Sequence, residues 1–155
     1  MTIIKLRGVK NLASDIRLNQ LYNQFEVLLS ELRKRALPDT IAETINKEVE
    51  EINTSNSLTT NDLRKVIKKK QTAILRLIEK DLKLVPKNYY RTLWLALGMT
   101  VFGIPIGILA GTLLGNFGLF AIGLPVGVAF GVTVGSIMDK NAVKENRQLN
   151  VEIKY

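Results

Sequence analysis

Residues 92–138 read TLWLALGMTVFGIPIGILAGTLLGNFGLFAIGLPVGVAFGVTVGSIM, a run of 47 residues without Asp, Glu, Lys or Arg. An α-helix rises about 1.5 Å per residue, so roughly 20 residues cross the ~30 Å hydrocarbon layer of a bilayer. The run is too long for one crossing and suits two crossings with a tight turn between them. We therefore expect transmembrane helices at about 90–114 and 119–138, joined by a turn at 115–118.

The charged residues all lie outside this run. The chain carries 22 Lys and Arg against 14 Asp and Glu, a net charge of +8. A soluble core of this length would have no wettable face, so we prefer the membrane interpretation. Basic residues flank both crossings and the turn has none, which predicts a multi-pass protein of the inner (cytoplasmic) membrane with both termini in the cytoplasm. The residues expected at the lipid headgroups are Lys87, Tyr89, Tyr90, Arg91, Trp94 and Lys140.

Glycines form an internal repeat within the two crossings. The segment Gly103-Ile104-Pro105-Ile106-Gly107 matches Gly123-Leu124-Pro125-Val126-Gly127 at an offset of 20, and glycine then recurs at every fourth position. Residues four apart share one helix face, where bare backbone lets another helix approach closely. The predicted packing residues are Gly103, Gly107, Gly111, Gly115, Gly123, Gly127, Gly131 and Gly135. Their partner is either the other helix of the same hairpin or, in addition, a neighbouring subunit.

The two prolines predict a local change in each crossing. Pro105 cannot donate to the carbonyl of Val101, and Pro125 cannot donate to that of Ala121. We expect a kink in the N-terminal third of each helix, at matched positions of the repeat.

The repeated GxxxGxxxG resembles the glycine-zipper motif of bacterial membrane proteins, which is found in small two-helix proteins and in pore-lining helices of some channels. The resemblance covers about residues 98–138, and residues 1–88 resemble no family. It implies a homo-oligomer and permits a pore, but it carries over no catalytic residues.

The flanking sequence is typical of helices. We predict an all-α membrane protein with a helical cytoplasmic domain over 1–88, a transmembrane hairpin over 89–138 and a cytoplasmic tail over 139–155. Apolar residues at helical spacing place helices at about 14–36, 39–53 and 60–85, with Pro86 ending the third. Ser14 or Asp15 would cap the first helix and Thr59 or Thr60 the third. The first helix also fits a short coiled-coil seam that two subunits could share.

Two further features leave alternatives open. The basic run Arg64, Lys65, Lys68, Lys69 and Lys70 is either a solvated helix face, a site for anionic lipid headgroups, or a nucleic-acid contact. No aromatic platform accompanies it, so we do not expect a nucleic-acid partner. The segments 2–6 and 150–155 are rich in β-formers, and they are either short strands that pair with each other or flexible ends.

Composition excludes several functions. The chain has no His and no Cys, so zinc chemistry, disulfides and His-based catalysis are absent, and we expect neither a cofactor nor a metal. The N-terminus lacks the apolar core of a signal peptide. A coupled transporter would need an ionisable group within the membrane, and the run 92–138 contains no Asp, Glu, Lys or Arg. Two hypotheses remain: a structural or accessory subunit that presents its helical domain to a protein partner, or a homo-oligomeric channel that permeabilises the membrane.

Overall fold

The computed structural model describes residues 2–8, 15–55, 58–116, 118 and 120–153. The chain divides into two compact units. We call Met1–Val85 with Leu149–Tyr155 the helical unit, and Pro86–Gln148 the hairpin unit. The predicted tail is therefore not a separate part, because 139–144 continue the last helix and 149–155 belong to the helical unit.

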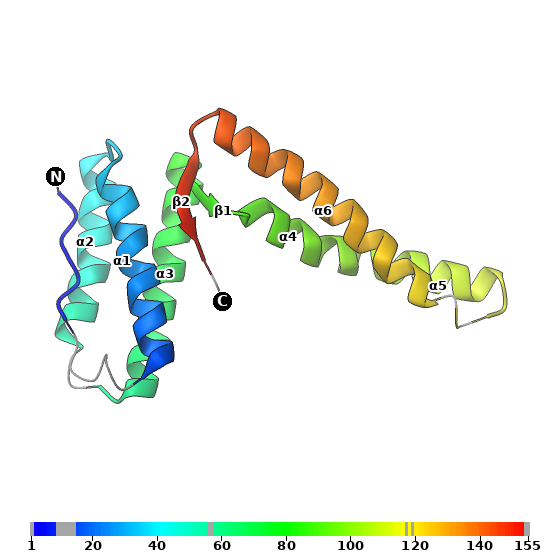
Figure 1. Ribbon diagram of the computed structural model, residues 1–155, viewed down its shortest axis with the longest axis horizontal. Helices are drawn as coiled ribbons and strands as arrows, with labels where there is room; N and C mark the ends of the chain where they lie inside the picture. Colours follow the sequence, from blue (N-terminus) through cyan, green and yellow to red (C-terminus); the bar gives the residue numbers. More distant parts are fainter. Residues whose placement is uncertain (1, 9–14, 56–57, 117, 119, 154–155) are drawn as a thin grey trace. The chain divides into compact units, whose positions relative to one another are not determined.

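The helical unit contains α1 (Ile16–Arg33), α2 (Asp39–Thr54) and α3 (Thr60–Leu82), close to the expected ranges (Figure 1). Asp15 caps α1 by accepting a hydrogen bond from the backbone N–H of Leu18. Thr59 caps α3: its hydroxyl oxygen accepts from the backbone N–H of Asp62, and the hydroxyl donates to the Asp62 carboxylate. Pro86 does not end α3: the helix stops at Leu82, since Lys83 adopts a left-handed conformation.

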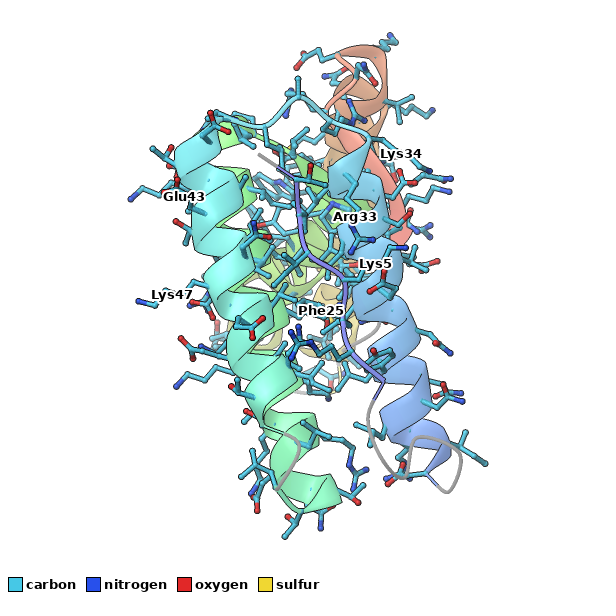
Figure 2. The ribbon with its side chains drawn as sticks, turned by 90° about the vertical axis from the view of Figure 1, so that its left-hand side faces the viewer. Lys5, Phe25, Arg33, Lys34, Glu43 and Lys47 are labelled. Atoms are coloured by element: carbon cyan, nitrogen blue, oxygen red, sulfur yellow. The ribbon has the colours of Figure 1, made fainter. Side chains whose placement is uncertain are left out.

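The core of the helical unit consists of the apolar faces of its own helices. Phe25 is fully buried at the centre of α1 (Figure 2). The apolar seam of α1 is buried within this chain and is not free to pair with another subunit, so the coiled-coil prediction finds no support in it. The residues of this seam are Leu18, Leu21, Tyr22, Phe25, Leu28, Leu29 and Leu32.

The N-terminal segment 2–8 lies between α1 and α2 as an extended chain (Figure 2). Ile3 and Leu6 are buried in the core. Two asparagine side chains of α2 form the hydrogen bonds to the backbone of this segment that a partner strand would otherwise form. Asn46 Oδ1 accepts from Ile4 N–H at 2.9 Å and its Nδ2 donates to the carbonyl of Thr2. Asn53 repeats this pattern one heptad later, accepting from Arg7 N–H at 2.8 Å and donating to the carbonyl of Lys5.

Side chains of α1 complete the contacts of this segment. Arg33 donates to the carbonyls of Ile3 and Ile4, at 3.0 and 2.8 Å, and the Tyr22 hydroxyl donates to the carbonyl of Arg7. Of the two alternatives for segment 2–6, a paired strand or a flexible end, the structure shows neither. The β-forming sequence is extended, but its backbone bonds go to side chains rather than to another strand.

Replacing Asn53 tests how strongly these side chains hold the segment. Asn53→Leu would remove the partners of the Arg7 N–H and of the Lys5 carbonyl, and would leave the bond from Tyr22 to the Arg7 carbonyl as the remaining tie at this end. We expect the amide of Arg7 to exchange with solvent at least several-fold faster by hydrogen-exchange mass spectrometry. Thr54→Ala is the matched control, because the Thr54 hydroxyl bonds only to carbonyls of its own helix. Equal exchange in both variants would contradict this role.

The two strands are β1 (Val85–Lys87) and β2 (Gln148–Glu152), which pair in a two-stranded sheet. The predicted C-terminal strand therefore exists, although it begins two residues earlier and its partner is 85–87 rather than 2–6. Leu149 and Val151 are buried, and Asn150 N–H donates to Glu31 Oε2 of α1 at 3.1 Å. The alternating pattern of apolar residues correctly marks the face of β2 that contacts the core.

Acid should destabilise the helical unit through a small set of carboxylates. The Lys70 ammonium lowers the pKa of Glu51 below its usual 4.5, and hydrogen bonds to Thr59 and to the Leu18 N–H lower the pKa of Asp62 and of Asp15 below 3.8. A lowered folded-state pKa contributes stability that is complete above the unfolded value and is lost as the pH falls through the folded value.

We therefore expect the melting temperature, followed by circular dichroism, to be constant from about pH 7 to 5.5 and to fall below about pH 4.5. Glu51→Gln should reduce the acid-sensitive part of the drop. A melting temperature that already falls between about pH 7 and 6 would contradict the assignment to carboxylates.

The hairpin unit contains α4 (Tyr89–Leu97), the π-helix η1 (Gly98–Gly103), α5 (Ile104–Leu113) and α6 (Phe120–Lys144). Two continuous helical stretches, Tyr89–Leu113 and Ala121–Lys144, are long and apolar enough to cross a membrane. Within this unit α4 and α5 run beside α6 (Figure 1). The last helix extends six residues beyond the predicted end at Met138, because Asp139 and the residues after it continue the helical pattern rather than beginning a tail.

Candidate functional site: the glycine interface of the hairpin

The glycines of the two helices face each other within one hairpin. Gly98 lies against Gly127 and Gly131, and Gly123 lies against Gly103 and Gly107. Further along α6, Gly131 meets the backbone of Trp94, and Gly135 meets that of Tyr90 and Arg91. The contacts join backbone to backbone, an arrangement in which dispersion and weak Cα–H···O contacts act along the whole interface.

This interface has no room for a side chain at its glycines. A Cβ added to Gly98, Gly123, Gly127, Gly131 or Gly135 would lie within 3.0 Å of backbone atoms of the opposite helix, closer than real Cβ contacts allow. Backbone cannot move aside as the end of a flexible side chain can. The close helix approach therefore explains why the chain accepts the cost of roughly 1 kcal/mol that each glycine imposes on a helix relative to alanine.

The glycines of the two motifs do not all face each other, because the two helices run antiparallel. Gly103 and Gly107 meet Gly123 and Gly127, whereas Gly131 and Gly135 pack on residues that precede the first motif. Gly111 is buried on α5. Gly115 is a correction to the predicted packing set: it lies in the turn at φ +62°, and an added Cβ would meet nothing within 4 Å. Its glycine is required by the backbone conformation of the turn rather than by helix contact.

Gly98 is an interface residue that the four-residue spacing missed. It stands five positions before Gly103, and the intervening segment is π-helical, so that Ile104 N–H donates to the carbonyl of Met99 five residues back. The wider turn of a π-helix places residues five apart on one face and keeps Gly98 in the interface. The sequence signal for this π-helix was the spacing of five residues between Gly98 and Gly103, together with Pro105 two residues later.

The two prolines have different effects. Pro105 lies in the first turn of α5, directly after the π-helix, where its missing N–H coincides with the change of helix type. Pro125 lies inside α6, which continues as an α-helix from Phe120 to Lys144. Only the first crossing changes its hydrogen-bonding pattern at its proline, and the kink expected at each proline stays a prediction.

Asp139 closes the end of the hairpin where α4 begins. Its Oδ1 accepts from Tyr90 N–H and its Oδ2 from Arg91 N–H, both at 3.0 Å, and the residue is only 8% exposed. Asn88, the residue before α4, makes no side-chain capping bond. The carboxylate of α6 thus caps the neighbouring helix and interacts favourably with its dipole. Sequence reasoning placed Asp139 in the tail and gave it no role.

The outward surface of the hairpin is apolar. Exposed leucine, isoleucine and valine side chains cover it, and Phe102 contacts Phe130 across the two helices with ring centroids 4.8 Å apart. The hydroxyls of Thr100, Thr112 and Thr133 bond to carbonyls of their own helices. Within the described ranges no three acidic side chains are grouped as a metal site requires. The glycine contacts and the apolar outer faces suit this interface to packing in an apolar medium.

The residues predicted at the headgroups lie at the ends of the hairpin helices. Tyr89 and Tyr90 make an edge-to-face ring contact with centroids 5.2 Å apart at the start of α4. Arg91 and Trp94 follow on the same helix, and Lys140 is exposed beside Asp139 on α6. Lys87 precedes them on β1. Since Asp139 bonds to Tyr90 and Arg91, these positions of α4 and α6 share one end of the hairpin.

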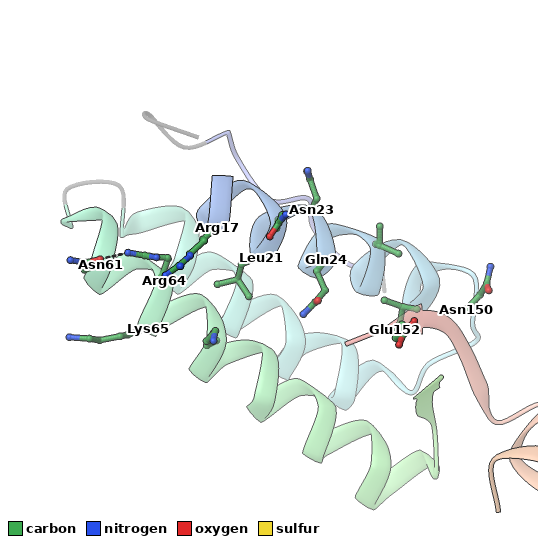
Figure 3. Close-up of a pocket in the computed structure, with 13 residues that line it drawn as sticks. Arg17, Leu21, Asn23, Gln24, Asn61, Arg64, Lys65, Asn150 and Glu152 are labelled. Carbon is green, nitrogen blue, oxygen red and sulfur yellow. Dashed lines mark hydrogen bonds between the residues drawn. The ribbon is translucent and has the colours of Figure 1, made fainter. Parts of the chain in front are cut away.

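The basic run 64–70 is divided between two faces of α3. Lys70 is paired with Glu48 at 2.8 Å and with Glu51, both of α2, and these carboxylates raise its pKa. Only 15% of its side chain is exposed, so we remove Lys70 from the predicted headgroup set. Arg64, Lys65 and Lys68 instead line a groove beside α1 (Figure 3). Lys69 is exposed and does not line it.

No protein-family model, curated protein or solved structure matches the chain.

Proposed function

We propose that the chain is an integral membrane protein whose hairpin unit anchors the helical unit to a bilayer and presents it to a partner. The observation that supports this proposal is that the two kinds of helix face in the hairpin have different contacts. Its glycine faces are used between its own two helices, and its remaining faces are apolar. Such a hairpin satisfies its backbone internally and leaves aliphatic side chains for lipid, which is the requirement for a spanning structure.

The geometry supports an anchor better than a pore. A ring of hairpins around an aqueous path needs a face with free polar groups. The hydroxyls of Thr100, Thr112 and Thr133 are already bonded within their helices, and the glycine faces are covered. Self-association of the anchor would use the aliphatic outer faces. Current recordings on liposomes test the alternative: a reproducible conductance that grows with protein density would favour the channel.

Membrane topology tests the anchor. The chain has no cysteine, so single cysteines report one position each. A membrane-impermeant maleimide applied to intact spheroplasts should label Asn116→Cys in the turn and should label Lys69→Cys only after the membrane is opened. Both residues are exposed, so burial does not affect the comparison. Labelling of both from the same side, or recovery of the protein in the soluble fraction, would contradict the proposal.

A further inference from the structure

A groove between α1 and α3 is lined by cations and carboxamides, together with the apolar side chains of Leu21, Val27 and Val151. Its volume is about 1030 Å³, enough for several residues of a peptide. Arg17, Arg64 and Lys65 cluster at one end, while β2 contributes Glu152 at the other end (Figure 3). Glu152 is the single carboxylate among the lining residues, and at the end where Arg17 lies the cations outnumber the two neighbouring carboxylates, Asp15 and Asp62.

Two of the four cations form no salt bridge within the part of the chain that the structure describes. Arg64 is engaged by Asn61 and lies 3.9 Å from Asp15, and Lys65 pairs with Asp62. Among the described residues, no carboxylate forms a salt bridge with Arg17 or Lys68. The Asp15 carboxylate does interact electrostatically with Arg17, so Lys68 is the less compensated of the two. They lie on opposite walls, one on α1 and the other on α3, and they leave positive charge directed at whatever occupies the groove.

The carboxamides indicate what kind of occupant fits. Gln20, Asn23 and Gln24 line the wall formed by α1, and Asn61 lies on the other wall. A carboxamide can donate and accept at once, as a peptide group does. Behind Gln24 lies Gln71, which is 3% exposed, accepts a bond from Gln24, and has no acceptor for its own Nε2 in the described structure.

The same helical unit already binds an extended chain with this chemistry. Asn46, Asn53 and Arg33 hold segment 2–8 by reciprocal bonds to its backbone. The groove between α1 and α3 offers the same residue types without an occupant from the described chain. Its excess of cations selects for acidic side chains.

From this combination we propose that the groove binds an extended acidic peptide segment of a partner protein. Carboxylates of the peptide pair with Arg17 and Lys68, and its backbone bonds to the carboxamide of Gln20, since Asn23 and Gln24 already donate to Asn19 and Gln71. This inference rests on the proposed role of the helical unit in presenting a binding surface. Its test does not depend on topology, because binding is measured on purified protein.

The test uses the full chain in nanodiscs of uncharged phosphatidylcholine. The probe is a fluorescein-labelled octapeptide that alternates Glu and Ser, blocked at both ends, and anisotropy gives its dissociation constant. Arg17→Glu with Lys68→Glu should weaken binding by about tenfold or more, because two attractions become repulsions. The matched control is Lys69→Glu with Arg76→Glu, which changes the net charge equally on exposed residues outside the groove. We expect a change of less than about twofold there.

Two peptide variants and one cross-link complete the design. Replacing Glu by Gln in the probe should abolish the difference between the two double variants, and N-methylation of the backbone should weaken binding several-fold. A benzophenone form of the probe should cross-link the wild-type protein to α1 or α3, a readout that needs no variant to fold.

Four results would overturn the proposal. They are undetectable binding of the acidic probe, equal weakening in both double variants, no effect of N-methylation, and cross-links confined to other elements. Binding of phosphatidylglycerol vesicles that only the groove variant abolishes, without binding of the peptide, would assign the groove to lipid headgroups instead.

Discussion

Gly131→Leu is expected to separate the two helices of the hairpin. A Cβ at Gly131 would lie within 3.0 Å of the carbonyl group of Trp94, and a leucine side chain would extend further into the α4 backbone. Overpacking of this kind costs roughly 1–3 kcal/mol even in cores that can adjust. Since backbone rather than side chain must move here, the helices should part along the segment that contains Gly127 and Gly135 as well.

The single tryptophan of the chain reports this change directly. Trp94 is half-buried against α6, so quenching of its fluorescence by brominated lipids should rise when the helices separate. Ala129→Leu is the matched control, because Ala129 is exposed on the same helix two residues away. Equal quenching in Gly131→Leu and in the control would show that the glycine contact does not hold the hairpin together.

Asp139→Ala is expected to release the first turn of α4 from α6. Loss of the carboxylate leaves two N–H groups, those of Tyr90 and Arg91, without acceptors, at roughly 1–3 kcal/mol for each donor that stays buried. We expect hydrogen exchange at these two amides to accelerate by about tenfold or more. Asp139→Asn retains one carbonyl acceptor and should give an intermediate rate.

Asn141→Ala serves as the control for this prediction, since Asn141 is exposed on the same helix. Unchanged protection of Tyr90 and Arg91 in Asp139→Ala would mean that α4 keeps its first turn without the cap. In that case the carboxylate would have no structural role at this end of the hairpin.

Much of the fold follows from local periodicity. The helices of the helical unit were predictable from the spacing of their apolar residues and from the capping residues Asp15 and Thr59. The two membrane-length helices were predictable from the uncharged run. All these signals are local in the sequence. The glycine interface was predictable in kind, since glycine at every fourth position has few other uses in an apolar helix. Its spatial register was not, because antiparallel packing moves Gly131 and Gly135 beyond the matching motif.

The missed features depend on contacts between distant residues. The bonds from Asp139 to Tyr90 and Arg91 join positions nearly fifty residues apart, and no local pattern distinguishes this carboxylate from those around it. Segment 2–6 has the composition of a strand, yet Asn46 and Asn53 provide its hydrogen bonds. In the sequence Lys70 cannot be distinguished from its basic neighbours, but in the fold it forms salt bridges with Glu48 and Glu51 of α2. In each case the role of the residue depends on a contacting residue that lies far away in the sequence.

Cross-linking of Phe102→Cys with Phe130→Cys tests the paired hairpin in a membrane most directly. The two rings lie on different helices with centroids 4.8 Å apart, and the chain has no other cysteine. In proteoliposomes at low protein density, a short bifunctional thiol reagent should join the two positions within one chain, and adding Gly131→Leu should suppress the product. Cross-links that form only between chains, or none at all with both thiols reactive, would contradict a hairpin closed on its own glycines.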